Sequence, residues 1–141
     1  MRAADLISQT VPLLKKNDTG SFALQAMSDQ HLSQLPLVHE GKLIGLIREE
    51  DIINHHKNDS KLQEMKLHVT KPFIHDYEHI FEVLKVASEM KMKVVPVVDK
   101  EENFLGCITL ENLMNYFAKD TDILEPGAIV VLEIAVNDYS L

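Results

Sequence analysis

The chain has 141 residues, of which 45% are hydrophobic and 26% charged, a mixture typical of a globular protein with a core of ordinary size. Its net charge of −8, with 22 acidic against 14 basic residues, opposes binding to the phosphate backbone of a nucleic acid. No apolar run approaches the roughly 20 residues that span a bilayer, so we expect neither a nucleic acid nor a membrane as partner.

Landmark residues recur along the chain at a nearly constant spacing. Two prolines recur 60 residues later, while a glycine and a polar position that follows it recur 61 residues later. The pairs are Pro12 and Pro72, Pro36 and Pro96, Gly45 and Gly106, and Asp51 and Asn112. The additional residue lies in the polar connection 99–103, where a loop tolerates a change of length. This spacing predicts two copies of one unit, at 1–60 and 61–120.

Each copy is predicted to contain a short strand, a helix, two strands and a closing helix. The first copy is expected to have a strand at 12–15, a helix capped by Asp18 or Thr19, and strands at 35–38 and 43–47 around the turn Glu40-Gly41. Its first helix carries an apolar stripe at helical spacing, namely Phe22, Ala23, Ala26 and Met27.

The second copy repeats this order. A strand is expected at 72–75, then a helix with the stripe Ile80, Val83, Leu84, Ala87 and Met90, then strands at 94–98 and 104–109. The closing helix places on one face the residues Leu110, Leu113, Met114 and Phe117. One copy is too small to bury its apolar faces well, so we expect the two copies to share a core.

The last residues, 121–141, follow a different pattern. Glu125-Pro126-Gly127 form a turn, the run 128–136 (AIVVLEIAV) predicts a strand, and 137–140 look like the cap of a helix that has barely begun. This segment resembles the first strand of an ACT domain, another small regulatory fold. Our hypothesis is that the chain is a fragment of a longer protein, cut inside its next domain.

Two segments carry a resemblance to the CBS domain family. They are LPLVHEGKLIGLIREEDII (35–53) and VVPVVDKEENFLGCITLENLM (94–114), within a similarity that covers roughly residues 5–120. The resemblance implies an α/β (α+β) fold with two β-α-β-β-α repeats related by pseudo-twofold symmetry, the sheets packed together and the helices outside. It also implies a regulatory Bateman module that binds an adenosine-containing ligand between the repeats and forms a homodimer.

The family's nucleotide motif, Gly-x-x-Ser/Thr-x-x-Asp, is half present in each copy. The first copy has the acid, Asp51, but Arg48 replaces the hydroxyl; the second has the hydroxyl of Thr109, but Asn112 replaces the acid. The resemblance implies that the hydroxyl and the helix start face a phosphate, and that the acid accepts bonds from a ribose. Arg48 can contact a phosphate instead, and Asn112 can bond a ribose.

His31 and Lys91, five residues before the strand prolines, complete the predicted ligand-binding set. That position is often basic in nucleotide-binding members, so the resemblance implies an anion-binding cleft. Each residue also has a purely structural interpretation. Thr109 is a good helix cap, Asp51 and Asn112 suit a first helical turn, and His31 and Lys91 are ordinary solvated side chains.

Metal and catalytic sites are not expected. The chain has seven histidines, and His75 and His79 have the i, i+4 spacing of zinc ligands on a helix. The repeat, however, aligns His79 with Thr19 at a helix start, which leaves His75 upstream of the helix. Cys107, the single cysteine, lies in an apolar run and is expected to be a core residue in a reducing, cytoplasmic compartment. No Gly-rich phosphate loop or Gly-x-Ser-x-Gly elbow occurs.

These observations favour a regulatory module over an enzyme. The leading hypothesis is binding of an adenine nucleotide (AMP, ADP or ATP) or a ligand of the S-adenosylmethionine type, with no required cofactor. The alternative, kept open by the half-present motifs, is a dimerisation or structural module whose ligand sites have degenerated. An enzyme that acts on nucleotides is the third hypothesis.

Overall fold

The computed structural model describes residues 1–55, 59–65, 67 and 69–119. The first half contains the elements η1 (Ala3–Leu6), α1 (Gly20–Gln30), β1 (Gln34–His39), β2 (Lys42–Arg48) and α2 (Glu49–His55). The second half contains η2 (Leu62–Glu64), β3 (Ile74–His75), α3 (Ile80–Glu89), β4 (Val94–Val98), β5 (Phe104–Thr109) and α4 (Leu110–Lys119). The strand predicted at 128–136, with the ACT-like segment that contains it, lies outside the described residues.

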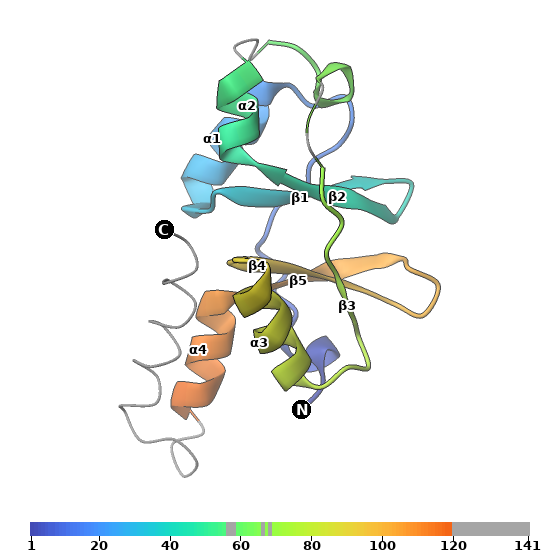
Figure 1. The fold of residues 1–141 in the computed structure, drawn as a ribbon, viewed down its shortest axis with the longest axis vertical. Coiled ribbons are helices and arrows are strands. Elements are labelled where there is room, and N and C mark those ends of the chain that lie inside the picture. The colour runs from blue at the N-terminus through green and yellow to red at the C-terminus, as the bar shows by residue number, and fades with distance from the viewer. Residues whose placement is uncertain (56–58, 66, 68, 120–141) are drawn as a thin grey trace.

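Each half has a small sheet on the inside and two helices on the outside (Figure 1). β1 pairs with β2 in antiparallel fashion, and β4 lies between β3, which is parallel to it, and β5, which is antiparallel. The two sheets face each other in the middle of the molecule, with α1 and α2 beyond one of them and α3 and α4 beyond the other. The predicted mixed α and β class with two similar repeats is confirmed.

The first strand of each copy is shorter than predicted. Leu14 makes a single parallel bridge to Leu37, and only Ile74 and His75 form β3. The amide of Lys15 bonds the side chain of Asp18 (2.7 Å) and so enters a turn instead of a sheet. Proline at the start of both predicted strands also lacks an amide donor for a ladder.

The predicted helical stripes are buried only in part. Ala23 and Met27 are buried in α1, but Phe22, one residue before Ala23 and therefore about 100° away around the helix, is exposed. In α3 the buried residues are Ile80, Val83 and Ala87. Met90 follows the last residue of α3 and is exposed.

The helices of the two halves begin at equivalent residues. The Thr19 hydroxyl accepts a hydrogen bond from the amide of Phe22 (3.1 Å) and caps α1, which settles the choice between Asp18 and Thr19. His79 caps α3 in the same place, since its Nδ1 accepts a bond from the amide of Phe81 (3.2 Å). An accepting Nδ1 requires the unprotonated ring nitrogen. The alignment of His79 with Thr19 is therefore confirmed.

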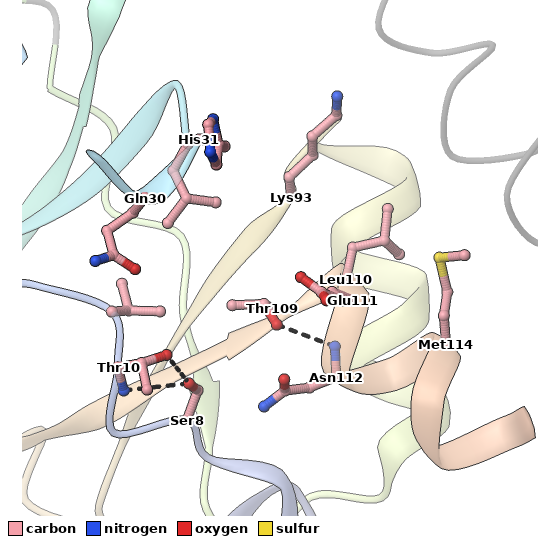
Figure 2. Close-up of a pocket in the computed structure, with 12 residues that line it drawn as sticks. Ser8, Thr10, Gln30, His31, Lys93, Thr109, Leu110, Glu111, Asn112 and Met114 are labelled. Atoms are coloured by element: carbon pink, nitrogen blue, oxygen red, sulfur yellow. Dashed lines mark hydrogen bonds between the residues drawn. The ribbon is translucent and has the colours of Figure 1, made fainter. Parts of the chain in front are cut away.

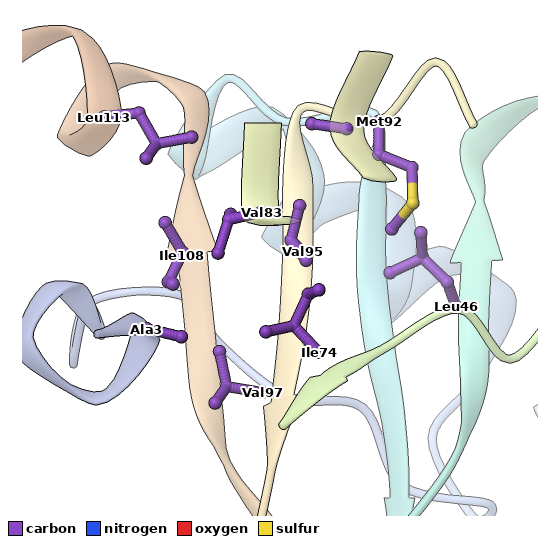
Figure 3. Packing of buried hydrophobic residues seen from close by; sticks show 10 residues of the cluster. Ala3, Leu46, Ile74, Val83, Met92, Val95, Val97, Ile108 and Leu113 are labelled. Carbon is purple, nitrogen blue, oxygen red and sulfur yellow. The ribbon is translucent and has the colours of Figure 1, made fainter. Parts of the chain in front are cut away.

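The apolar core joins the two halves across the facing sheets. Leu46 of β2, in the first half, packs into the cluster of the second half beside Met92 and Ile74 (Figure 3). The other buried members of this cluster are Ala3, Val83, Ala87, Val95, Val97, Ile108 and Leu113. Burial of this set removes apolar area from water, which is the main favourable term in folding. The predicted sharing of a core is confirmed.

Each half is completed by a segment that belongs, in sequence, to the other half. The amide of Ala3 in η1 donates to the carbonyl of Glu78 (2.8 Å), and the amide of Leu62 in η2 donates to the carbonyl of Asp18 (2.8 Å). The two bonds occupy equivalent positions of the repeat. Both Ala3 and Leu62 are buried in the core that they join. We call residues 2–11 and the described residues of 61–71 (61–65, 67 and 69–71), which make this exchange, the crossing segments.

The two glycines of the repeat lie where the crossing segments approach the strands. A Cβ at Gly45 would overlap the side chain of Val69, and a Cβ at Gly106 would lie 2.5 Å from Cγ2 of Ile7. Gly106 also has a φ of +147°, which side-chain-bearing residues rarely adopt. The backbone bonds made beside these glycines are Leu46 N to Thr70 O (2.8 Å) and Ser8 N to Cys107 O (2.7 Å). Glycine at both positions therefore permits the exchange.

The two hairpins meet at their turns. The amide of Phe104 donates to the carbonyl of Gly41 (2.8 Å), and Nζ of Lys42 donates to the carbonyl of Glu101 (2.8 Å). Both turns lie on the right in Figure 1, away from the ends where β5 runs into α4 and α1 runs into β1. The halves are thus bonded to each other at the hairpin end.

Cys107 is a core residue, as predicted. Its side chain is buried in β5, and burial raises the pKa of the thiol to about 12. A thiol with this pKa is protonated throughout the neutral range, because loss of the proton would leave a thiolate in apolar surroundings.

Alanine at Gly45 or Gly106 is expected to destabilise the fold by about 1–3 kcal/mol, because the added Cβ displaces a crossing segment. Gly41→Ala is the control: Gly41 has a φ of +76° but open space around it, so only backbone strain of about 1–2 kcal/mol is expected. Urea unfolding of the three variants measures these losses. Wild-type stability in Gly45→Ala would contradict the close approach of Val69.

Cys107 is expected to react with a thiol reagent only after unfolding. At pH 8 its raised pKa leaves on the order of a thousandfold less thiolate than an ordinary cysteine has. Labelling with a chromogenic disulfide should therefore be slow in the native protein and fast in guanidinium chloride. Equal rates in the two conditions would show that Cys107 is accessible.

Candidate ligand-binding clefts

A cleft of about 590 Å³ opens between the two halves, and we call it the first cleft. Figure 2 shows its residues, which come from the end of α1 and the residues after it, a crossing segment, the residue before β4, the end of β5 and the start of α4. They are Ser8, Thr10, Val11, Gln30, His31, Leu32, Lys93, Thr109, Leu110, Glu111, Asn112 and Met114. Three of the predicted ligand-binding residues, His31, Thr109 and Asn112, therefore line one cleft.

Thr109 ends β5 and caps α4. Its Oγ1 accepts a hydrogen bond from the amide of Asn112 (3.0 Å), which fixes the hydroxyl at the helix start (Figure 2). A hydroxyl has one proton and a second lone pair to spare, so a capping threonine can still donate to a ligand. The capping and ligand-binding interpretations of Thr109 are thus compatible.

Asn112 ties α4 to a crossing segment. Its Nδ2 donates to the carbonyl of Leu6 (3.3 Å), a bond that an aspartate carboxylate could not make. This gives a physical reason for asparagine where the family motif has an acid. The amide oxygen of Asn112 accepts no hydrogen bond from the described residues, so it is free to accept one from a ligand hydroxyl.

The crossing segment supplies a polar wall that the sequence analysis missed. The hydroxyls of Ser8 and Thr10 lie 2.8 Å apart, and the amide of Thr10 donates to Oγ of Ser8 (3.3 Å). Both residues line the first cleft beside Thr109. No sequence signal marks them, because their place depends on an exchange between copies that the linear pattern does not reveal.

The positions of His31 and Lys91 are equivalent in the backbone. Both residues have a φ of +54°, the left-handed conformation that ends a helix, and both are exposed. His31 lines the first cleft together with two charged residues, Lys93 and Glu111. Lys91 does not line this cleft. It lines a second cleft, which is related to the first by the pseudo-symmetry of the two halves.

The counterpart, which we call the second cleft, has a volume of about 290 Å³. Its lining consists of Ser33, Gln34, Arg48, Glu50, Lys91 and Lys93. Nη1 of Arg48 lies 3.7 Å from Oε1 of Glu50, which leaves the guanidinium only partly neutralised at an exposed site. The predicted pair Arg48 and Lys91 therefore lies apart from His31, Thr109 and Asn112.

Gln34 is the buried polar residue of the second cleft. The residue is 9% exposed, and its Oε1 is fully covered by protein and has no hydrogen-bond partner among the described residues. Asp51, in contrast, is half-buried on the first turn of α2 and lines neither cleft. Its role in ribose binding stays a prediction.

The two histidines with zinc-like spacing have structural surroundings. His75 stacks on Tyr77 (ring centroids 5.1 Å apart) and its Nδ1 lies 3.7 Å from the carboxylate of Glu78. His79 caps α3, as described above. Among residues 1–55, 59–65, 67 and 69–119, no three His, Cys, Asp or Glu side chains cluster in a way that could hold a metal ion. In that same part of the chain no helix has the length and apolarity needed to cross a bilayer.

Comparison with known families and sequences identifies two domains. The family model of the CBS domain matches residues 3–58 and 66–119. A CBS domain-containing protein of Dictyostelium discoideum is 24% identical over 136 residues, covering 86% of this chain and 92% of that protein. Inosine-5'-monophosphate dehydrogenase of Methanocaldococcus jannaschii is 27% identical over 116 residues, but the match covers only 23% of that enzyme.

Solved structures share the fold. A CBS domain pair/ACT domain protein of Thermotoga maritima has a TM-score of 0.75 and 21% identity, covering 85% of this chain and 98% of that one. CBSX2 in complex with AMP has a TM-score of 0.73 and 16% identity, with coverages of 85% and 98%. The CBS domain pair of protein MJ0100, in complex with 5'-methylthioadenosine and S-adenosyl-L-methionine, has a TM-score of 0.66 and 26% identity, also with coverages of 85% and 98%.

Proposed function

The chain belongs to the CBS domain family, as a tandem pair of domains, and we propose that the pair binds an adenosine-containing nucleotide in the first cleft and thereby regulates a partner. One observation carries this proposal: the Thr109 hydroxyl stands at the start of α4, in a cleft that the other half closes. A helix start favours an anion through its amides and its dipole.

The lining of the first cleft matches the parts of such a ligand. Its volume of about 590 Å³ falls within the range of small-molecule sites. Val11, Leu32 and Met114 offer apolar surface for a base. Thr109 and Lys93 can bind a phosphate, and the amide oxygen of Asn112 can accept a bond from a ribose hydroxyl.

Relatives support the class of ligand. CBSX2 binds AMP, and the CBS pair of MJ0100, 26% identical to this chain, binds 5'-methylthioadenosine and S-adenosyl-L-methionine. These ligands share an adenosine group and differ in charge. We therefore propose the adenosine group as the common requirement, with AMP, ADP, ATP and S-adenosylmethionine as the candidates.

Regulation follows from the way the cleft is built. Gln30, His31 and Leu32 come from the first half, whereas Thr109 and Asn112 come from the second. A ligand that contacts both halves prefers the arrangement in which both contacts are made, and it shifts the population toward that arrangement. We expect the module to act as a cytoplasmic homodimer, without a required cofactor and without catalysis of its own.

The alternative function is dimerisation by a module with degenerate ligand sites. Two observations favour it. Phe22 on α1 and Phe81 on α3 are 54% and 63% exposed on outward-facing helices. One of the two side-chain N–H donors of Asn112 is already used by the carbonyl of Leu6. Exposed aromatic side chains are typical of protein interfaces.

A nucleotide that binds the folded protein must raise its stability. We expect at least one of AMP, ADP, ATP and S-adenosylmethionine to raise the melting temperature, since a ligand at about 100 times its Kd adds about 2.7 kcal/mol to the free energy of unfolding. Thermal-shift and calorimetric titrations measure this, with NAD and cyclic dinucleotides included as further ligands. No shift with any of them, together with a dimer in sedimentation equilibrium, would favour the alternative function.

Thr109→Ala should weaken binding of a phosphorylated ligand about tenfold or more, because a hydrogen bond to a charged group is lost. Thr109→Ser is the matched control, since serine keeps both the helix cap and the donor. Asp51→Ala, in the other half, should leave affinity for the first cleft unchanged. The opposite result, loss of binding in Asp51→Ala and wild-type affinity in Thr109→Ala, would move the site out of the first cleft.

A further inference from the structure

Lys93 lines both clefts and lies where they adjoin. Its backbone is fixed beside α4, because its carbonyl accepts a bond from the amide of Leu110 (3.0 Å). The equivalent residue of the first half is Ser33, whose carbonyl accepts the corresponding bond from Glu49 (2.9 Å). Ser33 is short and lines only the second of the two clefts. The pair of clefts is therefore asymmetric at this position.

The side chain of Lys93 is able to contact an anion in either cleft. It is exposed, and in Figure 2 it extends away from Thr109 at the edge of the first cleft. An exposed lysine has four rotatable bonds in its stem and no fixed hydrogen-bond geometry. Its ammonium can therefore follow whichever anion lies nearby.

The positive charge available to bind an anion depends on Lys93 more in the first cleft than in the second. In the first cleft the other ionisable side chains are His31 and Glu111, so Lys93 is its permanent cation. The second cleft has Arg48 and Lys91 as well, opposed by Glu50. An anion in the second cleft can therefore be held without Lys93 and still attract it.

The lining of the second cleft suits a small anion. It brings Arg48, Lys91 and Lys93 around one hollow, with Glu50 as the opposing charge. A guanidinium and ammonium groups together can bind an oxyanion such as phosphate or pyrophosphate. The volume of about 290 Å³ suits such a group.

We propose that Lys93 couples the two clefts. An anion in the second cleft draws the Lys93 ammonium toward it. The first cleft then binds phosphorylated nucleosides less tightly. Affinity for an uncharged nucleoside stays the same. This inference rests on the proposed function, because it requires the first cleft to bind a nucleoside. Coupling of this kind is reciprocal, so AMP must weaken binding of the anion by the same factor.

The test uses AMP and adenosine as paired probes of the first cleft and pyrophosphate as the probe of the second. Each nucleoside is titrated calorimetrically into the full chain, with and without pyrophosphate, while sodium chloride keeps the ionic strength constant. We expect pyrophosphate to weaken AMP binding about two- to fivefold, the range for an exposed charge pair, and to leave adenosine binding unchanged.

Two variants separate coupling from direct competition. Lys93→Ser, which copies the residue at the equivalent position of the first half, should bind AMP less tightly and lose the effect of pyrophosphate. Arg48→Ala combined with Lys91→Ala should bind AMP normally and also lose the effect. A pyrophosphate effect that persists in the double variant would show direct competition in the first cleft and overturn the proposal.

Other outcomes are equally decisive. Equal weakening of AMP and adenosine would mean that the clefts communicate by some route other than the charge of Lys93. Unchanged AMP affinity in the presence of pyrophosphate would mean that the clefts are independent. Both results overturn the coupling while the nucleotide site stands. Absence of binding by both AMP and adenosine would instead overturn the proposed function, and the coupling with it.

Discussion

The exchange of crossing segments between the two halves is the constraint on which the rest of the structure depends. Residues 2–11 complete the second half and the described residues of 61–71 complete the first, through equivalent backbone bonds such as Ala3 to Glu78 and Leu62 to Asp18. The exchange explains why glycine stands at two positions of the repeat, since a Cβ there would meet the incoming segment. It also places Ser8 and Thr10 in the first cleft, opposite a helix from the other end of the chain.

The sequence predicts local secondary structure here better than it predicts which segments of the chain pack together. The strands expected at 94–98 and 104–109 are β4 and β5 residue for residue, because proline, glycine and β-branched residues restrict the backbone directly. The folded structure, and not the alignment of the copies, groups His31, Thr109 and Asn112 in one cleft. The position of residues 2–11 could not be predicted, since an apolar residue such as Ala3 indicates burial but not the sheet that buries it. Ser8 was missed for this reason, whereas Lys93 was missed because it belongs to no recognised motif.

One scaffold thus presents two chemically different clefts. Equivalent backbone positions hold Thr109 in one and Arg48 in the other, and the same is true of His31 and Lys91. The first cleft is larger and combines hydroxyls with apolar surface, whereas the second is smaller and cationic. Pseudo-symmetry of the fold therefore does not extend to the side chains that line the clefts.

The contact between the hairpin turns has a mechanical consequence. Phe104 and Gly41 bond the halves at one end of the molecule, and Lys42 adds a second bond there, while both clefts lie toward the other end. The bonded end then acts as the axis of any rotation of one half against the other, and displacement grows with distance from it. Helix α4 begins at Leu110, beside the first cleft, so it lies on the side of the molecule where such a rotation would displace residues most.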